Sequence, residues 1–323
     1  MSGYRALFIL AIFANTSAVF AIQPTALFLL DAQPNIRQYS MGEIFSAANP
    51  KDAVSNPWEL GYSKTASAYF SHWPGAVNES QYNFISAVLP YKKLGGFNLS
   101  YLTYGTGSET FEELDGTSRS IQLENNKVVS FGYGRKLGER FFVGGSLKYL
   151  SSTLADQYTA TSLLKDFGAA YHALDDKYSF GIAVLNSGSA LKYYQTREPI
   201  PTELKLGYTR KFTLPGQKVI LGFSFANSQV RKSYSVGVEW FPNISFVSVR
   251  AGANKRDSGT RFSSGLGLNW QSFDFDLGYD LSSQKIEDGQ SPLRFAISWY
   301  FLPKTNKPSA EPLNDKMPKI GTQ

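Results

Sequence analysis

Three aspartates in one short segment are the residues whose type and spacing point most clearly to chemistry. Asp274, Asp276 and Asp280 share one face if residues 273–282 form a strand, because successive strand side chains point to opposite faces. Carboxylates on one face could line a cation path, or hold Ca²⁺ together with other oxygen ligands. The alternative is that these aspartates are lumen-lining residues, on the hydrated inner wall of a barrel, and pair with cations on neighbouring strands. The candidate cations are Lys205, Lys211, Arg250 and Arg294.

Other catalytic or metal-binding chemistry finds little support in the sequence. The chain has no Cys, and its two His residues, His72 and His172, have no local partner pattern. No set of nucleophile, base and acid can be assembled, so we expect no enzyme, no cofactor and no metal. The net charge of +6 is spread over turns and polar strand positions without a basic run, which argues against a nucleic-acid partner.

The aspartates belong to a long series of strand-like segments between residues 64 and 302. In residues 273–280 every second residue is large and apolar, and the residues between them are charged or Gly. We count about fourteen such segments, which predicts an all-β protein. Their approximate spans are 64–73, 80–90, 94–105, 119–135, 140–151, 158–173, 177–187, 202–213, 217–227, 233–242, 245–254, 260–270, 273–282 and 292–302.

The connections between the predicted strands alternate between long and short. Those after odd-numbered strands are longer and polar, such as 106–118 and 188–201, whereas those after even-numbered strands are tight, such as 213–216 and 271–272. Long loops at one end and short periplasmic turns at the other are typical of outer-membrane barrels. An even strand number also returns both ends of the sheet to the periplasm. We therefore predict a transmembrane antiparallel β-barrel of about 14 strands.

A soluble barrel or propeller is the alternative, since the sequence does not show which face points outward. Two observations favour an outward apolar face. Fourteen strands enclose more volume than one apolar row per strand would fill. Aromatic residues also recur near the predicted strand ends, as interfacial girdles require; they are Tyr69, Trp73, Tyr91, Tyr104, Tyr149, Phe212, Trp240, Trp270, Trp299 and Tyr300.

The first 21 residues have the features of a cleavable signal peptide. Arg5 precedes an apolar stretch, and Val19-Phe20-Ala21 fits cleavage after Ala21. A membrane anchor is the alternative, but the apolar run is short for a bilayer span and is interrupted by polar residues 15–17. Export and a barrel together predict the outer membrane of a Gram-negative-type bacterium, with membrane lipid as a partner. The polar residues 303–323 are expected to form a disordered periplasmic tail.

Residues 22–63 lack clean alternation and differ from the barrel that follows. The two Asn-Pro pairs, 49–50 and 56–57, mark turns. A segment of this size is too small to fold alone, so we expect it to pack in the barrel lumen as a plug. A disordered periplasmic leader is the alternative. The expected plug motif consists of Met41, Gly42, Asn56 and Pro57.

Several stretches occur in the order found in a known family. Residues 37–42 and 53–57 resemble the N-terminal segment of the PorV/PorQ family of outer-membrane proteins, which belong with the fatty-acid-transporter type of fourteen-stranded barrel. Residues 137–149 resemble its central hairpin, and 167–171, 184–188 and 199–208 continue the pattern. The departure is at Trp58 and Glu59, where the family usually has Ala-Gly after Asn-Pro.

The resemblance implies a part in type IX protein secretion or in cargo attachment at the cell surface. Its partners would be secretion-system components or exported cargo proteins. The kinship with fatty-acid transporters implies an alternative, a channel for hydrophobic small molecules with the N-terminal segment as a movable hatch. A third hypothesis is a structural barrel that docks partner proteins through connections 106–118 and 188–201.

Overall fold

The computed structural model describes most of the predicted barrel and part of the segment before it. The expected signal peptide at 1–21 and the expected tail at 303–323 lie outside the described residues. The described ranges are 29–45, 53–75, 79–91, 94–112, 116–173, 177–244, 246–282 and 292–301.

Fourteen of the described strands form one closed antiparallel barrel, which confirms the predicted fold. Each barrel strand pairs with the barrel strand that follows it in the chain, and β1 pairs with β18 to close the sheet, with Ser67 opposite Tyr300. The barrel strands are β1 Ser67–Pro74, β2 Gln81–Tyr91, β3 Gly95–Gly105, β6 Glu124–Leu137, β7 Phe141–Leu154, β8 Tyr158–His172, β9 Tyr178–Gly188, β12 Glu203–Leu214, β13 Gln217–Ser228, β14 Lys232–Phe241, β15 Val247–Arg256, β16 Gly259–Trp270, β17 Phe273–Asp280 and β18 Leu293–Tyr300.

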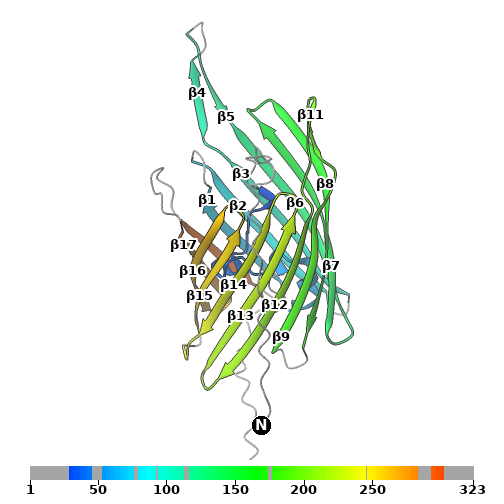
Figure 1. Ribbon diagram of the computed structural model, residues 1–323, viewed down its shortest axis with the longest axis vertical. Coiled ribbons are helices and arrows are strands. Elements are labelled where there is room, and N and C mark those ends of the chain that lie inside the picture. The colour runs from blue at the N-terminus through cyan, green and yellow to red at the C-terminus, as the bar shows by residue number, and fades with distance from the viewer. Residues whose placement is uncertain are drawn as a thin grey trace, which may run out of the picture.

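Two of the long connections form hairpins of their own beyond the barrel. One consists of β4 Ser108–Glu112 and β5 Ser118–Gln122, and the other of β10 Leu191–Tyr193 and β11 Thr196–Glu198. Figure 1 shows both hairpins at the same end of the molecule. The strand predicted for 119–135 was wrong at its start, because Ser118–Gln122 pairs with β4 and the barrel strand begins at Glu124.

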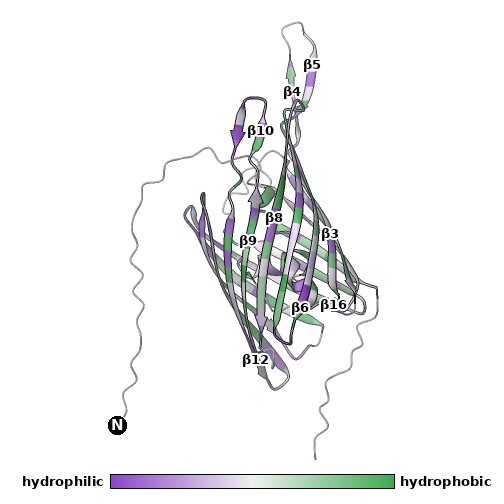
Figure 2. Ribbon diagram, turned by 90° about the vertical axis from the view of Figure 1, so that its right-hand side faces the viewer, coloured by the Kyte–Doolittle hydropathy of each residue, from purple (hydrophilic) through white to green (hydrophobic). Residues whose placement is uncertain are grey.

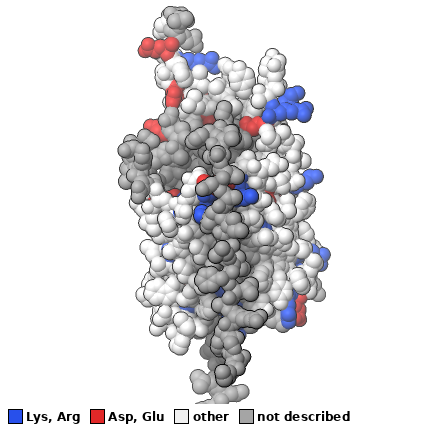
Figure 3. All heavy atoms as spheres, in the orientation of Figure 1, with Lys and Arg blue, Asp and Glu red and all other residues white. Residues whose placement is uncertain are grey.

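The two faces of the barrel wall differ as the alternation predicts. On β17 the side chains of Asp274 and Asp276 are 1% and 3% exposed, whereas Phe275 and Leu277 are 37% and 42% exposed. Apolar side chains therefore cover the outer face, and Figure 2 shows green and purple residues alternating along the strands. Much of the visible wall in Figure 3 is uncharged. An apolar outer surface of this extent suits lipid and argues against the soluble alternative.

Part of the expected aromatic girdle lies on the outer face. Trp240, Trp270 and Trp299 are 41–62% exposed near the ends of their strands, where Trp suits the membrane interface. The assignment was wrong for Tyr69, Trp73, Tyr104 and Tyr300, which sit on the inner face of their strands. Position near a strand end does not fix the face, because a shift of one residue reverses it.

Two short helices of the N-terminal segment lie within the ring of strands in both ribbon views (Figures 1 and 2). Helix α2, Ile36–Ser40, begins at Asn35, whose side chain accepts a hydrogen bond from the Gln38 backbone N–H. The 3₁₀ helix η2, Pro57–Gly61, has Pro at its first position, where no intrahelical N–H bond is required. The Asn56 backbone oxygen accepts from the Glu59 N–H at 2.9 Å. No helix among the described residues is long and apolar enough to cross a membrane.

Candidate functional site

The helix η2 rests on glycines that line the inner wall. Gly134, Gly144 and Gly168 are direct register partners across β6, β7 and β8, so they form one row. A Cβ on Gly134 would lie 2.0 Å from the Pro57 carbonyl oxygen, and a Cβ on Gly168 would lie 2.1 Å from Trp58 Cε3. Any side chain in this row would therefore displace η2.

The Met41–Gly42 part of the expected plug motif contacts a second row of glycines. A Cβ on Gly237 of β14 would lie 2.2 Å from the Met41 carbonyl oxygen, and a Cβ on Gly252 of β15 would lie 2.1 Å from the Met41 carbonyl carbon. Gly42 itself has a φ of +72°, which favours glycine, and its N–H donates to Ser263 Oγ at 3.1 Å. Both parts of the plug motif thus lie where the backbone of the N-terminal segment closely approaches the inner wall of the barrel.

A buried chain of four charged side chains links α2 to the barrel. Arg37 Nη2 of α2 lies 2.6 Å from Glu239 Oε2 of β14. The other carboxylate oxygen of Glu239 accepts from Arg250 Nε at 2.8 Å, and Arg250 Nη1 lies 2.5 Å from Asp276 Oδ1. All four side chains are at most 4% exposed. Positive and negative groups alternate, so each charge removed from water has a partner.

A second group of ion pairs holds the segment on either side of Met41. Glu43 pairs with Arg256 at 2.6 Å and also binds Arg261. Asp31 binds Arg231, and it pairs with Arg256 at 3.1 Å. Burial alone would raise the pKa of Glu43, but the guanidinium groups of Arg256 and Arg261 outweigh it and hold this pKa well below its ordinary value.

Tyr39 of α2 is held by cations on one side and a carboxylate on the other. The guanidinium of Arg294 lies 3.7 Å from the centroid of the Tyr39 ring, and the Tyr39 hydroxyl donates to Asp280 Oδ2 at 3.0 Å. Burial raises the pKa of Tyr39 to about 12, against the opposing effect of Arg294 and Arg261. The hydroxyl therefore keeps its proton and remains a donor.

The three aspartates that the sequence singled out all belong to such contacts. Asp276 binds Arg250, Asp280 accepts from Tyr39, and Asp274 accepts a hydrogen bond from Asn269. Among the expected cation partners, Lys205 instead lies 3.3 Å from Glu203. In the described ranges, no group of three or more His, Asp or Glu side chains could hold a metal ion.

A cavity of about 130 Å³ lies in the lumen beside the N-terminal segment. On β7 its lining residues are Ser146 and Lys148, one and two inward positions beyond Gly144, toward the end that carries the hairpins. On β3, β6, β8 and β12 the lining residues likewise lie on the hairpin side of the inward-facing glycine of the same strand. The cavity is therefore closed toward the opposite end by the segment on its glycine rows. It is lined by Leu29, Leu30, Asp31, Ala32, Gln33, Pro34, Gln38, Glu43, Phe45, Ala53, Val54, Ser55, Asn56, Pro57, Phe84, Asn98, Ser100, Leu102, Val128, Ser130, Ser146, Lys148, Asp166, Leu185, Asn186 and Lys205.

An irregularity in the β8–β9 ladder places a polar cluster in this cavity. The register shifts between Lys165 and Phe167, and Asn186 of β9 takes a φ of +58°. Asp166 fills the gap: its Oδ1 accepts from the Asn186 N–H at 2.8 Å, and its Oδ2 lies 2.7 Å from Lys148 Nζ. The cavity wall thus has polar groups on several sides, such as Asn98, Ser130 and Lys205, and the Asp166 cluster is one of them.

The two His residues lie apart, on opposite faces of the wall. His72 is on β1 with its Nδ1 2.8 Å from Asn83 Oδ1. His172 is buried at the end of β8, with its Nε2 3.7 Å from Glu59 Oε2 of η2. This contact was not predictable from the sequence pattern, and the roles of Glu239 and Asp166 were not predicted either. An acidic residue at an inward strand position is the signal that Glu239 and Asp166 share, but their partners depend on register.

No family model and no curated protein matches the sequence. Several solved structures share the fold. The toluene transporter TbuX of Ralstonia pickettii is 12% identical, with a TM-score of 0.56 over 82% of this chain and 97% of that chain. The toluene transporter TodX of Pseudomonas putida is 11% identical, with a TM-score of 0.55 over the same shares. The monoaromatic hydrocarbon channel CymD is 12% identical, with a TM-score of 0.54 over 83% and 97%.

These likenesses agree with the predicted fourteen-stranded barrel fold but give no support to the PorV/PorQ resemblance or to secretion partners. The quoted neighbours are named as transporters and channels. The chain is a closed fourteen-stranded outer-membrane β-barrel.

Proposed function

We propose that this protein is an outer-membrane channel for hydrophobic small molecules. The observation that carries the proposal is the luminal cavity, which lies between the hairpin end of the barrel and the N-terminal segment. Its lining mixes apolar side chains, such as Leu29, Leu102 and Val128, with polar ones, and small-molecule sites commonly combine an apolar surface with convergent polar groups. The neighbours named as toluene transporters share the fold and support the same solute class.

The N-terminal segment would act as a movable hatch in this channel. In the described residues each barrel strand is paired with both of its neighbours, and the irregularity between Lys165 and Phe167 beside the cavity is bridged by the Asp166 side chain. Ion pairs and close backbone contacts hold the segment, and its described residues, 29–45 and 53–63, form no strand pair with the wall. A solute that leaves the cavity toward the periplasm therefore requires the segment to shift.

A cavity-filling variant tests the function. Leu102 of β3 lines the cavity and is 9% exposed, whereas Leu99 of the same strand faces lipid and is 57% exposed. Leu102→Trp should lower the uptake of labelled toluene by intact Gram-negative cells about tenfold, because the larger side chain occupies the cavity. Leu99→Trp is the matched control and should transport like the wild type.

The result depends on a barrel that reaches the membrane. Both variants should be assembled to equal amounts, as judged by heat-modifiable migration of the folded barrel. Uptake by wild-type cells no faster than by cells without the protein would rule out the channel. Equal uptake by Leu102→Trp and the wild type would show that the cavity is not on the path.

A further inference from the structure

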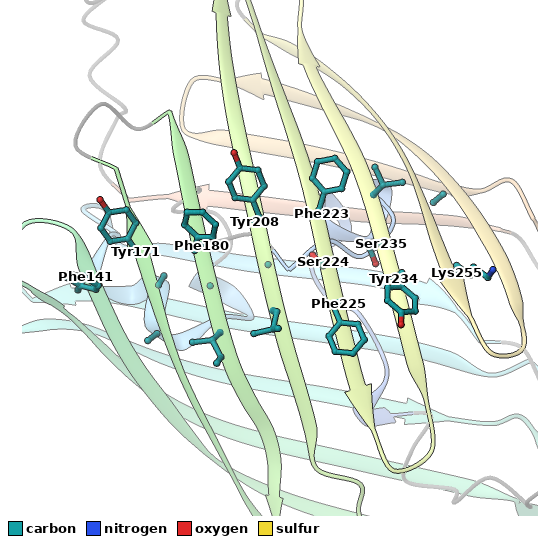
Figure 4. Close-up of a pocket in the computed structure, with 18 of the residues that line it drawn as sticks. Phe141, Tyr171, Phe180, Tyr208, Phe223, Ser224, Phe225, Tyr234, Ser235 and Lys255 are labelled. Carbon is teal, nitrogen blue, oxygen red and sulfur yellow. The ribbon is translucent and has the colours of Figure 1, made fainter. Parts of the chain in front are cut away.

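The outer wall carries an apolar groove of about 930 Å³ across β8, β9, β12, β13 and β14, which the proposed transport does not use. One side is a row of outward side chains that are register partners: Tyr171, Phe180, Tyr208 and Phe223. The other side is a parallel row two residues away, formed by Ile182, Leu206, Phe225 and Tyr234. Figure 4 shows the aromatic rings standing along the groove.

Small residues and paired rings give the groove its depth. Its floor is formed by inward-facing residues between the two rows, Ala170, Gly181, Gly207, Ser224 and Ser235. The rings of Phe180 and Tyr208 lie 4.9 Å apart, and those of Phe225 and Tyr234 lie 5.2 Å apart. Ring contacts within each row leave the space between the rows open to a flexible apolar chain.

The groove ends at a cationic side chain on the hairpin end of the barrel. Lys255 lines the groove and is the register partner of Tyr234, so it shares the outward face. Lys232 is exposed two residues before Tyr234 on the same face. Asp257 lies at the same end, where its Oδ2 accepts from the Lys232 backbone N–H at 3.0 Å. Figure 4 shows Lys255 at the opposite end of the groove from Phe141.

We propose that this groove is a binding site for a phosphorylated glycolipid of the outer leaflet. One acyl chain lies between the two rows of apolar side chains, and a phosphate of the head group is bound by Lys255 and Lys232. Three features favour this ligand: the groove is apolar along its length, its cationic end lies at the hairpin end of the barrel, and that end faces the outer leaflet by the loop asymmetry of outer-membrane barrels. Lys is a common phosphate-binding residue.

Native mass spectrometry of the barrel in detergent tests the site with defined lipids. Purified lipid A should form a one-to-one complex that survives gentle activation. Dephosphorylated lipid A should bind about tenfold more weakly, because it leaves the two lysines without their phosphate. Phosphatidylglycerol that binds as tightly as lipid A would overturn the choice of a glycolipid, and dephosphorylated lipid A that binds equally well would overturn the role of the lysines.

Two variants with matched controls locate the site. Ala169→Trp fills the groove from β8, and Ala251→Trp places the same side chain on the outer face of β15 outside the groove. Lys232→Gln with Lys255→Gln removes the cationic end, and Lys165→Gln removes an exposed lysine outside the groove. We expect about tenfold weaker lipid A binding for the groove variants and unchanged binding for the controls. Unchanged binding in both groove variants would overturn the proposal.

Discussion

Glu239 is the residue whose ion pairs link the N-terminal segment to the barrel wall. It accepts hydrogen bonds from Arg37 of the segment and Arg250 of β15, and it is 1% exposed. Buried ion pairs stabilise a fold weakly, yet the loss of one partner is costly because a charge then remains without compensation. Glu239 therefore decides whether α2 can remain against the wall.

The substitution Glu239→Gln should lower the free energy of unfolding by about 3–5 kcal/mol, because it removes the buried carboxylate charge that the Arg37 and Arg250 guanidinium groups share. Urea unfolding of the barrel in lipid vesicles measures the change. Glu139→Gln, at an exposed turn between β6 and β7, is the control and should lie within about 0.5 kcal/mol of the wild type. Equal unfolding midpoints for Glu239→Gln and the wild type would contradict the assigned role.

At the scale of elements, the glycine rows determine where η2 lies. Trp58 is 0% exposed and covers Gly168 on β8, so it has no open space into which to move. The contact is between one helix and three strands, since Gly134, Gly144 and Gly168 are register partners. One methyl group added in this row would therefore shift the whole of η2.

Gly168→Ala should displace η2 and cost about 1–3 kcal/mol, because its Cβ would overlap the Trp58 ring. Hydrogen exchange should become faster in residues 53–63 and stay unchanged in the strands. Gly105→Ala on β3 is the control, since its Cβ would meet the end of the flexible Gln122 side chain at 3.0 Å and the Glu124 carbonyl oxygen at an ordinary contact distance of 3.9 Å. Slow exchange in residues 53–63 of Gly168→Ala would show that η2 is not held by this row.

The strand alternation was predictable from the sequence because it is local. Residues 273–282 read as a strand with inward aspartates, and β17 has that form. Contacts that depend on register were not predictable. Arg37 and Glu239 are 202 positions apart, and the Gly134–Gly144–Gly168 row exists only after β6, β7 and β8 are aligned. The inward faces of Tyr69 and Trp73 were missed because aromatic residues occupy both faces of β1, where Phe70 faces outward.

At the scale of the whole molecule, the barrel wall and the N-terminal segment differ in how their described residues are held. The described strands pair around the full circumference, while residues 29–45 and 53–63 attach through side chains and close backbone contacts. Motion is expected where hydrogen-bonded pairing is absent. The secretion role implied by the PorV/PorQ resemblance stays a prediction without support from the comparisons.

A reversible cross-link tests the central claim, that solute passage requires the segment to move. The Phe45 N–H donates to Ser224 Oγ of β13 at 2.5 Å, and the chain has no Cys of its own. The pair Phe45→Cys with Ser224→Cys should therefore fix the segment to the wall when oxidised. Ser179→Cys with Thr209→Cys is the control, because it joins β9 to β12 and leaves the segment unattached.

The measurement is the uptake of labelled toluene by intact cells before and after a reductant is added. We predict that the oxidised Phe45–Ser224 pair lowers uptake at least about tenfold, that the reductant restores it, and that the control pair has no effect in either state. Equal uptake by the oxidised and reduced forms of the Phe45–Ser224 pair would contradict the account.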